Sequence, residues 1–211
     1  PLVELEAVHD GFSLKRPWQF RPGDDMSWAD PQYDSADWVE RMVPEPWPIG
    51  GFPDAGQFAW YRLTLQLDIK NSERQKDLDQ LAIRLGKILS AYEIYAGGQL
   101  LGGAGKLPPL SEVDFDRMRV FSIPADAVAS DGTLVLALRV WGGETVAMGF
   151  SRAGPFRGDF KLGDHRILLL SGLLAELPGL LVGVLFVGFG FYHLYLYSRN
   201  KQLNTYLWYG L

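Results

Sequence analysis

The chain has 211 residues, with 20 Lys and Arg against 25 Asp and Glu, so its formal net charge is −5. Residues 1–160 hold 16 of the basic and 23 of the acidic side chains, a net charge of −7. That balance argues against nucleic acid or anionic lipid as the main partner, because both need a basic surface. Cysteine is absent, which excludes disulfides and thiolate chemistry but fixes no cellular compartment.

The first 160 residues carry the alternation of β-strands rather than a helical period. Apolar residues recur at every second position, the pattern of half-buried strands. The pattern covers residues 57–68, 81–85, 90–101 and 133–141. Gly97-Gly98 interrupts the third of these as a two-residue hairpin turn would. Several short strands separated by Gly, Pro and Asp predict a mainly β head with a sandwich architecture.

Two hydrophilic or irregular stretches separate these strands from the rest of the chain. We expect residues 71–80 to form a solvated loop. Residues 142–164 are Gly-rich, and we expect them to form an irregular exit from the head. Residues 161–176 then read as a connector or an interfacial helix.

The last quarter of the chain predicts a membrane span. Residues 177–197 contain no Asp, Glu, Lys or Arg, and as a helix they would measure about 31 Å, close to the thickness of a bilayer core. We place transmembrane helix 1 at residues 177–198 and the truncated start of helix 2 at residues 204–211. Basic residues after the span favour a cytoplasmic C-terminal side, and therefore a periplasmic head on a bacterial inner membrane.

The sequence carries no recognisable catalytic motif or spacing of metal ligands. The three histidines, His9, His165 and His193, lie far apart in the sequence, without the spacing of metal ligands. No nucleophile motif or phosphate loop is present. We therefore expect no catalytic residue and no cofactor in this part of the chain, whatever enzyme the full-length protein carries.

The densest acidic group is Asp24, Asp25, Asp34 and Asp37. Carboxylates at this spacing are weak candidates for a Ca²⁺ site. The alternative is that they close turns and cap backbone groups, as Asp does beside Gly, Pro and Ser.

The candidate ligand face consists of Trp60, Arg62, Arg139 and Trp141. Trp60 and Arg62 lie on the non-core side of one predicted strand, and Arg139 and Trp141 on that of another. If the two strands are neighbours, the four side chains form an aromatic and cationic patch. Aromatic rings commonly stack on the apolar face of a sugar. The alternative is that both tryptophans pack inside the head, as we expect for Trp18, Trp28, Trp38 and Trp47.

Four segments occur in an order known from one enzyme family: YDSADWVERMVPEPW, GQFAWYRLTLQL, LAIRLGKILSAYEIYAGGQLLGG and FSIPADAVASDGTLVLALRVW. They span most of residues 15–141 and resemble the galactose-binding-like, sugar-binding-like jelly roll at the N-terminus of glycoside hydrolase family 2 enzymes. Ala96-Gly97-Gly98 stands where that family usually has an Asn-Gly turn, which weakens the kinship with the enzymes. The resemblance implies a jelly-roll β-sandwich and no catalytic residue, because catalysis in that family resides in a separate barrel.

The segments that follow suggest a second resemblance. PFRGDFKLGD, an apolar helix ending YHLYLYSRN, and then YLWYGL are similar to the N-terminal part of bacterial seven-transmembrane sensors with diverse intracellular signalling modules. This resemblance implies a periplasmic sensor head, seven helices and a cytoplasmic output. The output would be a serine/threonine phosphatase, a diguanylate cyclase or a histidine kinase, and FRPGDDMSWADPQYDSADW is most similar to versions with the phosphatase.

The sequence therefore predicts the sensory part of a membrane signalling receptor, with residues 1–160 as a head that binds a small molecule or carbohydrate. The lipid bilayer is a second partner, and a homodimer a third candidate. Gly179 and Gly183 allow close approach of helices, either between protomers or, as a multi-span protein favours, against later helices of the same chain. A rival hypothesis is a structural head used for dimerisation or for contact with another protein. A third, an accessory domain of an anchored glycosidase, is disfavoured by the second apolar run from Tyr206.

Overall fold

The computed structural model describes residues 2–4, 11–48, 57–68, 78–110, 112–114, 117–143 and 152–199. The chain divides into two compact units, Pro1–Leu169, which we call the head, and Leu170–Leu211. Each unit is described by itself.

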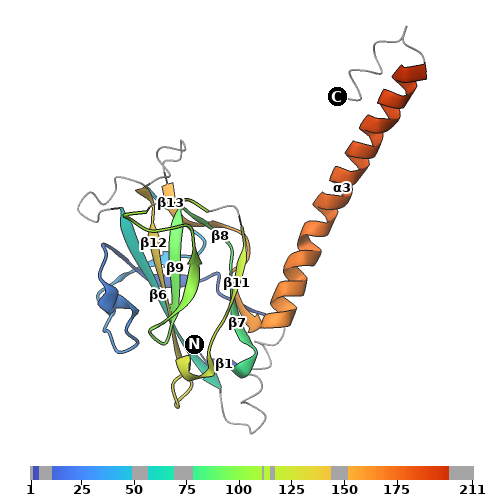
Figure 1. The fold of residues 1–211 in the computed structure, drawn as a ribbon. Coiled ribbons are helices and arrows are strands. Elements are labelled where there is room, and N and C mark those ends of the chain that lie inside the picture. Colours follow the sequence, from blue (N-terminus) through green and yellow to red (C-terminus); the bar gives the residue numbers. More distant parts are fainter. Residues whose placement is uncertain are drawn as a thin grey trace. The chain divides into compact units, whose positions relative to one another are not determined.

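The largest sheet of the head has seven strands and is antiparallel apart from one pair (Figure 1). Its strands in spatial order are β10 (Gln99–Ala104), β9 (Ala91–Ala96), β12 (Thr133–Trp141), β6 (Phe58–Asp68), β3 (Pro17–Pro22) and β4 (Val39–Met42). The seventh strand, β1 (Leu2–Glu4), runs parallel to β6. We call this sheet the main sheet.

Two smaller sheets supply the second layer. One contains β11 (Arg119–Ser122), β7 (Leu81–Leu85), β14 (Lys161–Asp164) and β2 (Phe12–Ser13). The other contains β5 (Trp47–Pro48), β13 (Arg152–Arg157) and β8 (Lys87–Leu89). Short 3₁₀ helices η1 (Met26–Ala29) and η3 (Ala125–Ala127) complete the described elements of the head.

The core lies between the inner side of the main sheet and the smaller sheets. Alternate residues of β6 and β12 point into it: Tyr61, Leu63, Leu65, Leu67, Leu134, Leu136, Leu138 and Val140. They meet β7 through Leu81, Ile83 and Leu85. Removal of this apolar surface from water is the main force that holds the layers together. The predicted mainly β sandwich, with its alternating strands, is confirmed.

The predicted hairpin between β9 and β10 is also confirmed. Gln99 pairs with Ala96 across the turn, and Gly97 and Gly98 have φ of +54° and +83°. A two-residue turn of this kind needs positive φ at both central positions, which glycine adopts without steric cost.

The expectation of an irregular exit over residues 142–164 is wrong for the described part of that stretch. It holds β13 and β14, and β14 joins β7 on one side and β2 on the other. The glycines that suggested irregular chain are used inside this structure: Gly154 has φ of +98°, and its missing side chain leaves room for Trp47. Residues 71–77 of the predicted solvated loop and 144–151 of the predicted exit lie outside the described residues.

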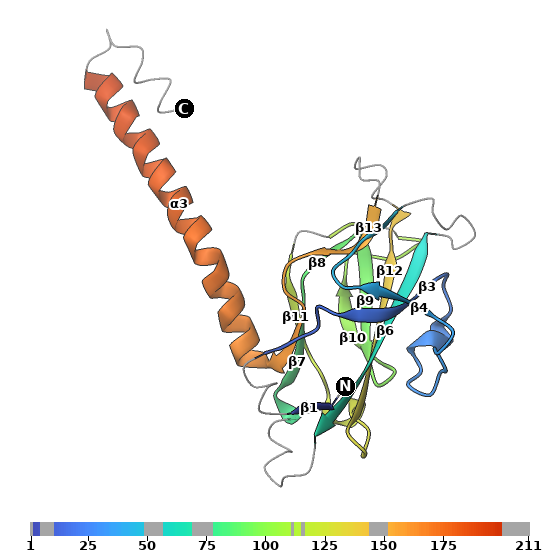
Figure 2. The same ribbon diagram turned by 180° about the vertical axis from the view of Figure 1, so that it is seen from behind.

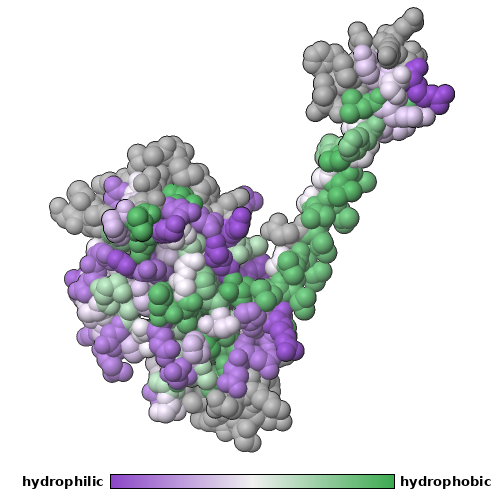
Figure 3. Space-filling view, in the orientation of Figure 1, coloured by the Kyte–Doolittle hydropathy of each residue, from purple (hydrophilic) through white to green (hydrophobic). Residues whose placement is uncertain are grey.

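The head is followed by one long helix, α3 (His165–Arg199), of 35 residues. Its described apolar side chains from Leu169 onward are mostly exposed, as the visible face in Figure 3 illustrates, and it is long and apolar enough to cross a membrane. Pro178 lies within this continuous helix rather than at a new helix start. The predicted apolar helix after the sandwich is confirmed, while the boundaries at residues 161, 177 and 198 stay predictions and residues 204–211 lie outside the described part of the chain.

Candidate functional site

The four predicted ligand-face residues lie on one side of the main sheet, facing away from the core. Strands β6 and β12 are neighbours, as the prediction required, and Arg139 stands directly opposite Trp60. Ala137 is opposite Arg62, and Trp141 is opposite Phe58. The sequence pattern therefore located one face of two adjacent strands.

This outer face is covered by residues 23–38, which we call the cover segment (blue in Figure 2). Its Trp28 packs edge-on against Trp60 at 6.2 Å between ring centroids, and Trp38 packs against Trp28 at 5.2 Å. On the other side Tyr95 of β9 stacks on Trp60 at 5.6 Å. Trp60 is fully buried, so its ring is used in a second apolar cluster and is not an open platform for a sugar.

Arg62 of β6 holds the cover segment on the main sheet through hydrogen bonds. One guanidinium nitrogen, Nη1, donates to the carbonyl oxygens of Trp28 and Asp30 at 2.6 and 2.9 Å, and Nη2 donates to that of Tyr33 at 3.2 Å. The residue is only 1% exposed, and this burial lowers the pKa of its guanidinium. A planar group with five donors suits this task, because it reaches three carbonyls of one loop at once.

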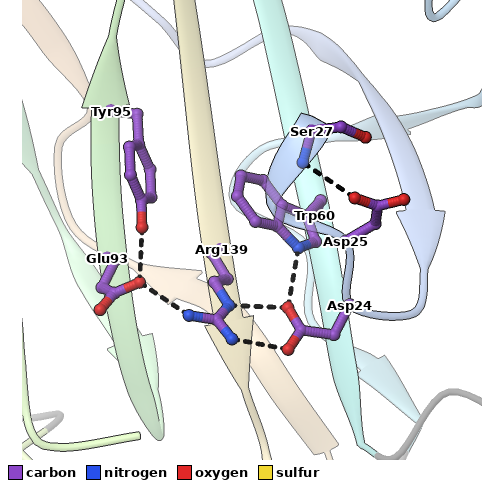
Figure 4. Close-up of polar contacts among 7 residues, drawn as sticks. All are labelled: Asp24, Asp25, Ser27, Trp60, Glu93, Tyr95 and Arg139. Carbon is purple, nitrogen blue, oxygen red and sulfur yellow. Dashed lines mark hydrogen bonds and ion pairs between the residues drawn. The ribbon is translucent and has the colours of Figure 1, made fainter. Parts of the chain in front are cut away.

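Arg139 ties the start of the cover segment to the sheet (Figure 4). Its Nε and Nη2 donate to the two carboxylate oxygens of Asp24 at 2.7 and 2.6 Å, and its Nη1 donates to Glu93 on β9 at 3.0 Å. Trp60 Nε1 donates to Asp24 at 3.3 Å, and the Tyr95 hydroxyl donates to Glu93 at 2.7 Å. This bidentate ion pair connects three strands and the cover segment in one network.

The network changes the titration of its members. Burial alone would lower the pKa of Arg139, but the hydrogen bonds and charges of Asp24 and Glu93 outweigh it and raise that pKa. Burial, together with the hydrogen bond to Glu93, raises the pKa of Tyr95. Arg139 is therefore charged and Tyr95 neutral throughout the physiological range.

Trp141 lies at the end of β12, beside Phe58 at 6.4 Å between centroids, and is 8% exposed. Arg139 lies over the same Phe58 ring at 5.0 Å. Packing therefore accounts for Trp141 as it does for the buried Trp18, Trp28, Trp38 and Trp47.

The four candidate Ca²⁺ ligands are each occupied within the head. Asp24 binds Arg139, and Asp37 accepts from Arg21 at 3.3 Å. Asp25 and Asp34 accept from the backbone N–H groups of Ser27 and Ala36 at 2.8 and 2.9 Å. The backbone hydrogen bond from Ser27 lowers the pKa of Asp25. Over the described residues, no three His, Asp or Glu side chains gather as a metal would require.

An open hollow of about 460 Å³ lies on the same outer face, and sequence reasoning missed it. Its lining residues are Arg16, Pro17, Gln19, Glu40, Arg62, Leu63 and Thr64. Gln19 stands between Glu40 and Arg62 in the sheet register, and its side-chain amide donates to the Ser35 carbonyl of the cover segment at 2.9 Å. The hollow depends on the pairing of β3 with β6, which no local pattern in the sequence reveals.

No protein-family model matches the chain, and no curated protein matches it either. Solved structures do match, among them a β-glucuronidase of Bacteroides uniformis, a glycosyl hydrolase family 2 member of Bacteroides cellulosilyticus and a β-glycosidase of Bacteroides vulgatus. In that order the identities are 21, 17 and 16%, with TM-scores of 0.55, 0.56 and 0.53.

These matches cover 72, 74 and 72% of this chain, but only 17, 21 and 20% of the enzymes. The chain thus spans about a fifth of their length, and at these identities the likeness concerns the fold. It confirms the resemblance to a β-sandwich of family 2 enzymes and gives no support to the resemblance to seven-transmembrane sensors.

Proposed function

We propose that this chain is the sensory part of a bacterial membrane signalling receptor, with the head outside the inner membrane and α3 as its first transmembrane helix. The head, a jelly roll in this proposal, binds a small molecule or carbohydrate. Ligand binding favours one arrangement of the head over another, and the helix passes that bias to a cytoplasmic phosphatase, diguanylate cyclase or histidine kinase.

The observation that carries this proposal is the junction between the sandwich and the helix. Strand β14 ends at Asp164 and α3 begins at His165, with no linker between them. The Asp164 carboxylate accepts from the backbone N–H groups of Arg166 and Ile167 at 2.8 and 3.1 Å and so caps the helix. Leu168, one turn in, is 1% exposed.

Strand β14 of the smaller four-stranded sheet and the apolar helix α3 thereby follow one another directly in the chain. His165 Nδ1 lies 2.8 Å from the Ser122 hydroxyl on β11, which ties the first helical turn to the same sheet. A shift of β14 relative to its neighbours would be carried directly into α3, whereas a flexible linker would absorb it. This favours signal transfer over simple anchoring.

Recognition of a carbohydrate is supported by the fold. The similar solved structures are enzymes that act on glycosides, and the match falls on a part of them about the size of the head. Binding without turnover is the function proposed for the head.

The test is thermal unfolding of the full chain in detergent micelles against a panel of neutral and acidic mono- and oligosaccharides. A ligand at about a hundred times its dissociation constant stabilises the folded state by about 2.7 kcal/mol, which is several degrees for a domain of this size. A reproducible shift with one sugar class supports the sensor. A flat panel with a folded head contradicts it, and self-association in a size measurement would then favour the dimerisation head.

A further inference from the structure

The hollow on the outer face carries two arginines with unpaired donors. Arg62 is almost fully buried, and while its Nη1 and Nη2 donate to carbonyls, its Nε–H has no partner among the described residues. The Nε–H of Arg16 is likewise shielded from water and unpaired within the described part of the chain. A buried donor without an acceptor costs free energy, which a bound oxygen atom would recover.

The rest of the lining suits a small polar ligand. A volume of about 460 Å³ lies within the usual range of small-molecule sites. Thr64 offers an exposed hydroxyl, while Pro17 and Leu63 supply apolar surface. The lining contains two guanidinium groups, those of Arg16 and Arg62, and one carboxylate, that of Glu40. Its formal charge is therefore positive, in a head that is acidic overall.

We propose that this hollow is the ligand site of the head and that its ligand is a sugar carrying a carboxylate. The inference rests on the proposed function, because it assumes that the head recognises a carbohydrate. The Nε–H groups of Arg16 and Arg62 would each donate to a carboxylate oxygen, and charge-assisted hydrogen bonds of this kind are shorter and stronger than neutral ones. A neutral sugar would offer these donors only uncharged oxygen atoms.

The proposed site also couples ligand binding to the position of the cover segment. Arg62 lines the hollow and holds three carbonyls of the cover segment, so an anion beside its guanidinium acts on both. Gln19, another lining residue, is bonded to the same segment through Ser35. A ligand in the hollow therefore contacts the groups that set the position of the cover segment.

The experiment measures the affinity of the full chain, in micelles at fixed ionic strength, for D-glucuronate and D-galacturonate and for their neutral parents D-glucose and D-galactose. We expect the acids to bind and the neutral sugars to bind at least about tenfold more weakly. The decisive variants are Thr64→Glu and its uncharged match Thr64→Gln. Thr64 is exposed, so both should fold, and only the glutamate should repel the acid and weaken binding, by about tenfold.

Two further variants test the sign of the charge effect. Arg16→Gln should weaken binding of the acids, while Glu40→Gln should strengthen it. Arg152→Gln on β13 removes one exposed positive charge outside the lining and should leave binding unchanged. Arg62 is left intact in this series, because it also holds the cover segment.

Three results would overturn the inference. If neutral and acidic sugars bind equally, the ligand class is wrong; if Thr64→Glu and Thr64→Gln bind the acids alike, the location is wrong. In both cases the head still binds a carbohydrate and the proposed function stands. If no sugar in the panel binds to a folded head, the inference and the proposed function fail together.

Discussion

At the scale of single residues, the outer face of the main sheet is organised by two arginines with different tasks. Arg139 forms ion pairs with Asp24 and Glu93 at a partly exposed edge, where such pairs contribute modestly to stability. Arg62 is enclosed and donates only to carbonyl oxygens, so its charge is stabilised by backbone dipoles. Loss of Arg62 therefore leaves the buried carbonyl of Trp28 and the partly buried carbonyl of Tyr33 without this donor, which costs more than loss of a surface ion pair.

We predict that Arg62→Met destabilises the head by about 3 kcal/mol, because the carbonyls of Trp28 and Tyr33 lose their Arg62 donor and that of Asp30 keeps only the backbone N–H of Tyr33. Arg62→Lys should lie between Arg62→Met and the parent, since a single ammonium cannot reach all three oxygens. The measurement is denaturant unfolding of the full chain in micelles. The exposed control Arg152→Met should stay within about 0.5 kcal/mol of the parent, and an equally small effect of Arg62→Met would contradict the assignment.

Sequence reasoning reached the right face for these residues but not their surroundings. Alternation placed Trp60 and Arg62 opposite the core side, which is where they lie. It could not show that the cover segment closes over them, because contacts such as Arg62 with Trp28 join positions 34 residues apart. The same limit hid Glu93 and Tyr95, whose role depends on β9 lying next to β12.

At the scale of elements, strands were predictable where side chains alternate and turns use glycine. The bounds of β12 agree with the predicted strand, and the β9–β10 hairpin follows from Gly97 and Gly98. Strands β13 and β14 were missed because their sequences are short and rich in glycine, and they are stabilised by partner strands rather than by their own pattern. The direct connection of β14 to α3 could therefore not be predicted from the sequence.

We predict that Leu168→Ala destabilises the head by about 2 to 5 kcal/mol, because Leu168 is buried although it belongs to the apolar helix. The neighbouring Leu169 is 43% exposed, so Leu169→Ala is the matched control and should have little effect. Denaturant unfolding of the two variants measures the difference. Equal stability of the two would mean that the first turn of α3 is not part of the head and that the proposed path of the signal is wrong.

At the scale of the whole molecule, the chain joins an acidic β-sandwich to a long apolar helix. The described side chains of α3 beyond Leu170 are largely exposed, which in water would be costly for a helix with so many Leu, Val and Phe. A bilayer removes that cost, and the helix has the length to cross it. A head with its own core and a helix apolar enough to cross a membrane together favour a membrane-anchored protein.

The membrane arrangement is directly testable with single-cysteine variants of this chain, because its 211 residues contain no native cysteine. Ser130→Cys places a thiol at an exposed position of the head, and Lys201→Cys places one just beyond the end of α3. With the outer membrane permeabilised, a membrane-impermeant maleimide should label Ser130→Cys and should reach Lys201→Cys only after the inner membrane is dissolved. Equal labelling of both from outside would show that α3 does not cross the membrane, and protection of Ser130→Cys would place the head in the cytoplasm; either result contradicts the account.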